Sequence, residues 1–161
     1  MNPFIYNIPT KVYFGENQLG NLGAELRKFG KRVLVTYGGG SIKRIGLYDK
    51  VMEELRKADM EVFELSGIEP NPRIESVREG ARICKEHNVD VLLAVGGGST
   101  LDATKFMAAV TEATKTTTTP LSMPNIPPKI LSVSFTTGIF LTMPSSNQTT
   151  TFNARTNKTN K

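Results

Sequence analysis

The 161-residue sequence contains one cysteine, one histidine and no tryptophan, and it has no long apolar run. A single cysteine, Cys84, excludes a framework of internal disulfides and is typical of a reducing compartment. No stretch approaches the roughly 20 apolar residues that a membrane span requires. The first residues, MNPFIYNIPTKVYFG, have neither the basic start nor the apolar core of a signal peptide. We therefore expect a cytoplasmic protein with no membrane partner.

Acidic residues are missing after Glu112, although five Lys or Arg residues lie beyond it. Acidic and basic residues balance up to that point, so the net charge of +5 arises entirely from residues 113–161. A basic stripe with interleaved aromatic residues, which nucleic-acid binding would require, is not present. The charge therefore predicts no nucleic-acid partner.

The first 112 residues alternate strand-like runs with segments of helical periodicity. This alternation predicts an α/β fold, in which a Rossmann-like parallel sheet is covered by crossover helices. Expected strands are Tyr6–Gly15 (as a strand or hairpin), Arg32–Tyr37, Glu61–Leu65 and Asp90–Val95. Expected helices are Leu19–Phe29, Asp49–Lys57, a helix capped by Asn71-Pro72 with the apolar stripe Ile74, Val77, Ala81 and Cys84, and Leu101–Val110.

Residues 113–161 have a different composition, rich in Thr, Asn, Ser and Pro. Only Ile130–Met143 resembles a strand, so we expect a poorly ordered Thr/Asn-rich tail. The resulting division is a nucleotide-binding domain over 1–112 and a low-complexity tail over 113–161. A frameshift, a truncated gene or an artificial fragment would each explain the abrupt change, and a native flexible extension is the alternative.

Two copies of Gly-Gly-Gly-Ser, Gly38–Ser41 and Gly96–Ser99, each follow an apolar strand and precede a helix. Glycines at a strand end let backbone N–H groups approach a phosphate, and the next helix offers unpaired N–H groups at its positive end. Tight turns with no ligand are the simpler interpretation of one such cluster. Two clusters at the same edge of one sheet favour a nucleotide, although neither is a GxGxxG fingerprint or a P-loop.

The turn after Tyr37 also indicates which nucleotide is bound. A carboxylate after an early strand normally accepts the ribose 2′-hydroxyl of NAD and repels a 2′-phosphate. Here the turn is followed by Lys43 and Arg44, and the first acid is Asp49. NADP is therefore favoured, while a solvated pair of surface cations is the alternative interpretation of Lys43 and Arg44.

Four stretches, in this order, resemble the iron-containing alcohol dehydrogenases, especially their NADPH-dependent butanol dehydrogenase and aldehyde reductase branch. They are Asn7–Gly15 (NIPTKVYFG), Thr36–Lys43 (TYGGGSIK), Gly67–Pro72 (GIEPNP) and Leu93–Lys105 (LAVGGGSTLDATK). Members of this family reduce aldehydes or oxidise primary alcohols by hydride transfer, with a divalent metal, Fe or Zn, polarising the oxygen.

The resemblance implies a role for each matching residue. Gly97, Gly98 and Ser99 would hold the diphosphate of NADP(H). Around the adenosine ribose and its 2′-phosphate it implies Gly38, Gly39, Gly40 and Ser41. The residues themselves add Gly96, from the second glycine turn, and Lys43, from its charge, as cofactor-binding candidates. Asn71 would reach the ribose on the adenine side. Asp102 would face the nicotinamide and the small alcohol or aldehyde, whereas the residues alone favour an ordinary surface contact with Lys105.

Departures from the family pattern concern the metal. Relatives continue into an all-helical domain that supplies one Asp and three His, but here the one histidine, His87, is expected at a helix end. Thr136-Thr-Gly138 is at best a remnant of the family's Ala-Thr-Gly-Ser-Glu motif. We therefore expect no metal site and no activity of this chain alone.

Two alternatives stay open besides an NADPH-dependent alcohol dehydrogenase. One is a non-catalytic nucleotide-binding module. The other is a glycerol-phosphate or sugar-phosphate oxidoreductase of the wider dehydroquinate-synthase-like group, which shares the second glycine turn. The resemblance also implies a homodimer formed through the N-terminal region.

Overall fold

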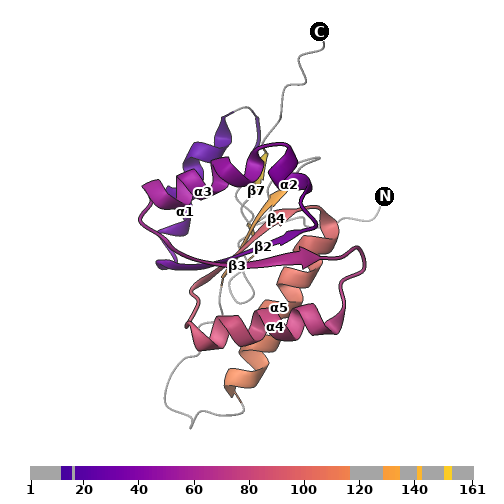
Figure 1. Cartoon of the computed structure of the whole chain (residues 1–161). Coiled ribbons are helices and arrows are strands. Elements are labelled where there is room, and N and C mark those ends of the chain that lie inside the picture. The colour runs from indigo at the N-terminus through magenta and orange to yellow at the C-terminus, as the bar shows by residue number, and fades with distance from the viewer. Residues whose placement is uncertain (1–11, 16, 117–128, 135–140, 143–150, 154–161) are drawn as a thin grey trace, which may run out of the picture.

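A computed structural model describes residues 12–15, 17–116, 129–134, 141–142 and 151–153 of the chain. These residues form one sheet with helices on both faces (Figure 1). The strands are β1 (Val12–Tyr13), β2 (Arg32–Gly38), β3 (Glu61–Ile68), β4 (Val91–Gly96), β5 (Lys129–Ser134), β6 (Leu141–Thr142) and β7 (Thr151–Asn153). The helices are η1 (Gln18–Asn21), α1 (Leu22–Leu26), α2 (Ser41–Arg44), α3 (Leu47–Lys57), α4 (Ile74–Glu86) and α5 (Gly98–Thr116).

Alternation along the central strands builds two apolar cores, one on each face of the sheet. In β2, Val33, Val35 and Tyr37 contribute to the core beneath α1 and α3, whereas Leu34 contributes to the core beneath α4 and α5. Strand β4 alternates in the same way. All six residues of β4 are buried, as expected for a central strand covered on both faces.

The order of the strands places a topological switch point between β2 and β4, where open α/β sheets have a crevice at the carboxyl ends of the strands. The described strands run β1-β7-β5-β4-β2-β3, all parallel except the short β6, which pairs antiparallel with β5. The chain leaves β2 through α3 toward β3 on one side, and leaves β4 through α5 toward β5 on the other. Figure 1 shows α3 and α5 on opposite faces of the sheet. This is a topological switch point, the place where open α/β sheets bind ligands.

Most of the expected elements up to residue 112 are confirmed, with small changes at their ends. Strands expected over Arg32–Tyr37, Glu61–Leu65 and Asp90–Val95 are present as β2, β3 and β4. Helix α5 begins at Gly98 rather than at Leu101, because the last glycines of the cluster already adopt helical backbone. In the opening stretch, β1 is a strand, while residues 6–11 lie outside the described residues.

The expected cap of α4 is wrong. Asn71 has φ of 57°, in the left-handed region that Asn tolerates, whereas an N-cap typically has extended backbone. Because Pro72 disfavours right-handed helical backbone at the residue before it, the helix cannot begin there. Arg73, with extended backbone, is the N-cap, and Ile74 follows as the first helical residue with 51% of its surface exposed.

The Thr/Asn-rich segment contributes strands to the sheet where it is described. β5 lies beside β4, in agreement with the strand-like pattern over Ile130–Met143. β7 pairs with both β5 and β1 and was not predicted. The remainder of 117–161 lies outside the described residues. The expectation of poor order concerns these residues and stays a prediction.

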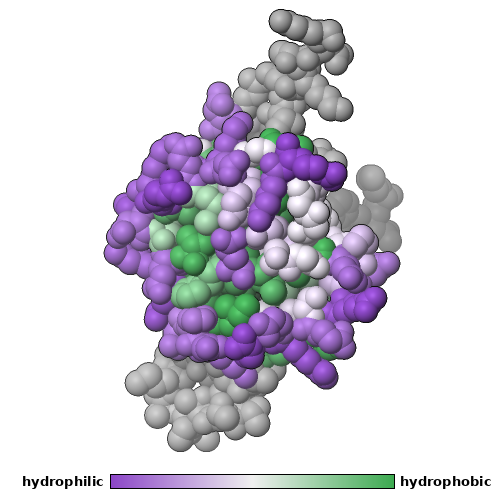
Figure 2. All heavy atoms as spheres, viewed as in Figure 1, coloured by the Kyte–Doolittle hydropathy of each residue, from purple (hydrophilic) through white to green (hydrophobic). Residues whose placement is uncertain are grey.

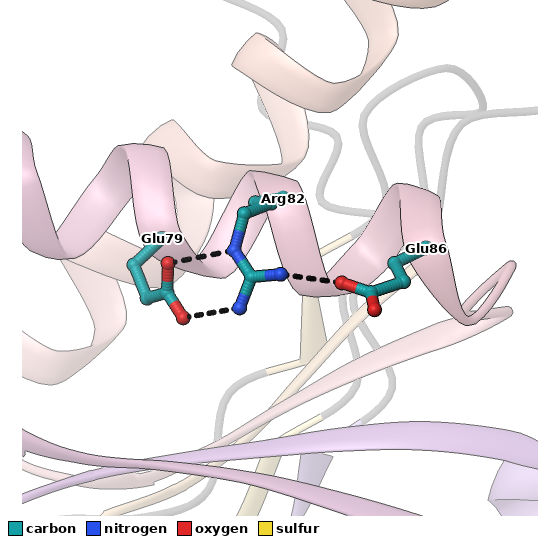
Figure 3. A network of polar contacts seen from close by, with 3 residues as sticks. All are labelled: Glu79, Arg82 and Glu86. Carbon is teal, nitrogen blue, oxygen red and sulfur yellow. Dashed lines mark hydrogen bonds and ion pairs between the residues drawn. The ribbon is translucent and has the colours of Figure 1, made fainter.

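Charged and apolar side chains are distributed differently over the surface. On α4, Arg82 binds Glu79 through two hydrogen bonds of 2.9 and 2.7 Å and also binds Glu86, one turn further on (Figure 3). The apolar residues visible in Figure 2 gather along the β3 edge of the sheet, between the two helical layers.

Among the described helices, none is long and apolar enough to cross a membrane. The homodimer expected through the N-terminal region stays a prediction.

Close packing of α1 on α3 depends on a glycine. A Cβ on Gly23 would lie 2.7 Å from the Cβ of Ala58 and 3.3 Å from the carbonyl oxygen of Glu54, so the two helices would have to separate. We expect Gly23→Ala to lower the free energy of unfolding by about 1–3 kcal/mol, measured by urea denaturation. This cost should exceed the gain of ~1 kcal/mol that Ala brings to a helix.

Gly20→Ala is the matched control, because nothing lies within 4 Å of a Cβ at that position. Its effect should stay within about 0.5 kcal/mol. Equal urea midpoints for the two variants would contradict the proposed packing.

Candidate functional site

The two glycine turns lie next to each other at the carboxyl ends of β2 and β4. Tyr37 pairs with Val95, so the residues that follow, Gly38 and Gly96, end neighbouring strands at the same edge. Gly38 also pairs with Ile68 at the end of β3. The sequence clusters are thus brought together at the crevice of the switch point.

The N-terminus of α5 faces this crevice without a side-chain cap. Its first backbone hydrogen bond runs from the Leu101 N–H to the Gly97 carbonyl, at 3.2 Å. The N–H groups of Gly98, Ser99 and Thr100 therefore have no partner within the helix. Gly97, in the capping position, has no side chain to accept from them. Ser99 is the second residue of the helix and therefore does not occupy the capping position.

Glycine is required at these turns for different reasons. A Cβ on Gly96 would lie 2.7 Å from Thr100 Oγ1, so the close approach of α5 to β4 demands glycine. Gly40 has φ of 94°, in the left-handed region. Among the described residues, no atom lies within 4 Å of a Cβ on Gly39, Gly97 or Gly98, and none of the three has left-handed backbone. At these three positions glycine leaves open space in front of the backbone.

Threonine hydroxyls attach α5 to the central strands. Thr104 donates to the Thr100 carbonyl at 2.7 Å, and Thr36 of β2 lies 2.6 Å from Thr104 Oγ1. Either hydroxyl can be the donor in this pair, and Thr36 Oγ1 also lies 3.4 Å from the Leu93 carbonyl oxygen, to which it can donate. Thr36 and Thr104 are fully buried, where a hydrogen bond is strong because water does not compete. This chain of contacts fixes the helix above the ends of β2 and β4.

One hydroxyl in this region has no partner. Thr100 is 5% exposed, and its Oγ1 makes no hydrogen bond with the part of the chain that the structure describes. The hydroxyl lies between the strand ends, since it would be 2.7 Å from a Cβ on Gly96 and 3.9 Å from one on Gly38. A buried hydroxyl without a partner carries a cost of about 1–3 kcal/mol.

Lys43, just past the first glycine turn, is held by aromatic side chains. Its Nζ lies 5.3 Å from the ring centre of Tyr37 and 4.7 Å from that of Tyr48, within the range of cation–π attraction. Both hydroxyls donate to Glu64, at 2.7 Å from Tyr37 and 3.0 Å from Tyr48. Burial and the bond to Glu64 raise the pKa of Tyr37 to about 12, so its phenol stays protonated at neutral pH.

The remaining predicted site residues lie at the same edge of the sheet or close to it. Ser41 is exposed at the start of α2, and Asn71 is exposed three residues after β3. Asp102 is exposed on α5, as the fifth residue of the helix. Asp102 and Lys105 form no ion pair in the described structure. Their roles toward a ligand stay predictions.

A metal site is not formed by the described residues. They contain no group of three His, Cys, Asp or Glu side chains that could hold an ion. His87 caps the C-terminus of α4, and its ring stacks on Phe63 with centres 4.2 Å apart. The donor set described here therefore does not fit the metal of the family, and no chemical step is derived through it.

A phosphate fits the N-terminus of α5. Three unpaired N–H groups, the positive end of a 19-residue helix and open space at two glycines are what anion binding requires. The unpartnered hydroxyl of Thr100 adds a fourth donor.

Comparison with known proteins assigns the family. A model of the iron-containing alcohol dehydrogenases matches residues 9–147, and the chain belongs to this family. The match continues past residue 112 into the threonine-rich segment. The relatives that follow are named as butanol dehydrogenases and aldehyde reductases.

Curated relatives include both NADH- and NADPH-dependent proteins. The probable NADH-dependent butanol dehydrogenase 1 of Bacillus subtilis is 57% identical over 109 residues, which are 68% of this chain and 28% of that protein. The NADPH-dependent aldehyde reductase YqhD of Escherichia coli is 45% identical over 109 residues, which are 68% of this chain and 27% of that protein. The chain thus spans less than a third of the length of these relatives.

Solved structures share the fold. The NADH-dependent butanol dehydrogenase A of Thermotoga maritima superposes with a TM-score of 0.70 and 33% identity, over 83% of this chain and 35% of that one. The substrate- and cofactor-free aldehyde reductase YqhD of Escherichia coli gives 0.70 and 31%, over 95% of this chain and 42% of that one.

Sequence reasoning did not find Thr100, Tyr48 or Glu64. Thr100 carried one available signal, since it lies four residues after Gly96, one helical turn from the strand end. Tyr48 and Glu64 carried none, because the fold alone brings Tyr48 to Lys43 and brings Glu64 to the hydroxyls of Tyr37 and Tyr48. Local sequence pattern does not show which distant segments come into contact.

Gly96 and Gly97 should respond differently to a methyl group. We expect Gly96→Ala to destabilise the fold by about 1–3 kcal/mol, because the added Cβ meets the side chain of the buried Thr100. Gly97→Ala should leave the urea midpoint nearly unchanged, because the space before it is open. Comparable losses in both variants would show that the second glycine also has a packing role.

Proposed function

We propose that this chain binds NADP(H) in the crevice between β2 and β4, as the nucleotide-binding part of an alcohol dehydrogenase or aldehyde reductase. The observation that carries the proposal is the N-terminus of α5 at Gly97 and Gly98, where a Cβ would meet no atom of the described residues and where the capping position has no side chain. Tight turns alone would explain the glycine at Gly96 but not at these two positions. Membership of the family supports the same conclusion.

The diphosphate lies at α5 in this proposal, and the adenosine ribose lies at the turn after β2. Gly38–Ser41 then surrounds the ribose, with the open face of Gly39 toward it. Lys43 supplies the positive charge for a 2′-phosphate, and the Tyr37 and Tyr48 rings restrict the directions that its side chain can take. A restrained cation loses less entropy when it binds an anion.

NADH is the second candidate for the cofactor. Relatives with 57% and 52% identity are named NADH-dependent. The charge of the β2 turn favours NADPH, since no acid lies between Gly38 and Asp49. Affinities for the two cofactors distinguish these candidates directly.

Hydride transfer between the nicotinamide and a primary alcohol or aldehyde is the reaction we propose for the whole protein. Nicotinamide supplies or accepts the hydride, and the residues of this chain bind and orient the dinucleotide. Asp102, exposed on α5, is proposed to face the nicotinamide and the substrate.

A non-catalytic nucleotide-binding module is the alternative function. It is favoured by the lack of a metal-binding cluster among the described residues. Incubation of the chain with NADPH, butanal and Fe²⁺ or Zn²⁺ is the experiment that can exclude the non-catalytic module. We expect binding without turnover from this chain, and NADPH oxidation that depends on butanal would contradict the alternative.

Gly97→Ala should weaken NADPH binding on the order of tenfold, because its Cβ would occupy space left for the diphosphate. Calorimetric titration of the 161-residue chain measures this change. Gly20→Ala, on η1 and away from the crevice, is the control and should bind like the parent chain. Unchanged affinity of Gly97→Ala would place the dinucleotide elsewhere.

Lys43→Gln should weaken NADPH binding by about tenfold and change NADH binding by less than about twofold, because only NADPH carries the 2′-phosphate. Lys50→Gln, on exposed α3 surface, removes the same charge at another position and is the control. Equal losses for both cofactors would mean that Lys43 has no role in selecting between them.

A further inference from the structure

Thr100 differs from the other buried threonines of α5. The hydroxyls of Thr104 and Thr111 each donate to the carbonyl oxygen four residues earlier, at 2.7 Å. For Thr100 the equivalent residue is Gly96, which belongs to β4, and no such bond is formed. The Thr100 hydroxyl is thus left with its proton uncommitted within the described structure.

Its position is in the crevice and not in the apolar core. Oγ1 would lie 2.7 Å from a Cβ on Gly96, and 3.9 Å from one on Gly38, so it lies at the ends of both β4 and β2. Thr100 is also the third residue of α5, and its backbone N–H is one of the three without a helical partner. Side-chain and backbone donors of one residue therefore lie at the same helix end.

The cost of this arrangement needs an explanation. Valine has nearly the same shape as threonine and would fill the same space without leaving a hydroxyl unpaired. Buried polar groups without partners are uncommon, and they mark places where a ligand or water completes the hydrogen bond. A phosphate oxygen has both the negative charge and the acceptor geometry that this hydroxyl and the adjacent amides require.

We infer that the Thr100 hydroxyl donates a hydrogen bond to the diphosphate of the bound dinucleotide. This inference rests on the proposed nucleotide-binding function and assigns to it a residue beyond the glycine turns. The hydroxyl acts as an anion ligand, and it makes the end of α5 selective for a diphosphate over a single phosphate.

The test is the pair Thr100→Val and Thr100→Ser in the 161-residue chain, titrated by calorimetry with NADPH, ADP and AMP. Thr100→Val should weaken binding of NADPH and ADP by about tenfold and leave AMP within about twofold. Thr100→Ser, which keeps the hydroxyl, should retain the affinity for ADP. In urea, Thr100→Val should unfold at the same or a higher midpoint, because it removes an unpaired buried hydroxyl.

Several results would overturn the inference. Unchanged ADP affinity in Thr100→Val would mean that water or the protein itself satisfies the hydroxyl. Equal losses for ADP and AMP, together with a lower urea midpoint, would mean that its role is structural. If the parent chain binds neither NADPH nor ADP, the proposed function fails, and the inference fails with it. Binding by the parent with no effect of Thr100→Val would overturn the inference alone.

Discussion

Unpaired backbone N–H groups at the start of α5 are the feature on which the rest of this site depends. A helix normally satisfies such groups with a Ser, Thr, Asp or Asn side chain at its N-cap. Here the capping position is Gly97, and the preceding Gly96 allows α5 to approach the end of β4 more closely than any other residue would. The positive end of the helix and its first N–H groups therefore face the crevice, and no capping side chain of the helix itself accepts from them.

The surrounding structure holds this helix end in place. Buried hydroxyls of Thr36 and Thr104 connect α5 to β2, while apolar side chains of α4, α5 and β4 form the core beneath it. On the opposite face, α3 packs against β2 and β4 and completes the switch point. Lys43 is held over Tyr37 and Tyr48, so the charge beside the β2 turn depends on the packing of α2 and α3. Donors and cation are thus both fixed by packing before any ligand arrives.

Local pattern predicted much of this fold and only part of the site. The apolar runs that end in glycine gave β2 and β4, because a buried strand followed by a flexible turn has few other interpretations. The role of Asn71 as the cap of α4 was predicted incorrectly. Pro72 disfavours helical backbone at the residue before it, and Asn71 adopts left-handed backbone instead. Thr100 and the tyrosines around Lys43 could not be recognised, because their significance arises from contacts between segments far apart in sequence. The strand β7 escaped prediction for the same reason, as its partners are β1 and β5.

A crystal structure of this chain with NADPH would test the central claim most directly. The account predicts the diphosphate at the N-terminus of α5, within hydrogen-bonding distance of the N–H groups of Gly98, Ser99 and Thr100, with the adenosine ribose against Gly38–Ser41. A dinucleotide bound outside the crevice between β2 and β4, or a diphosphate with no contact to α5, would contradict it.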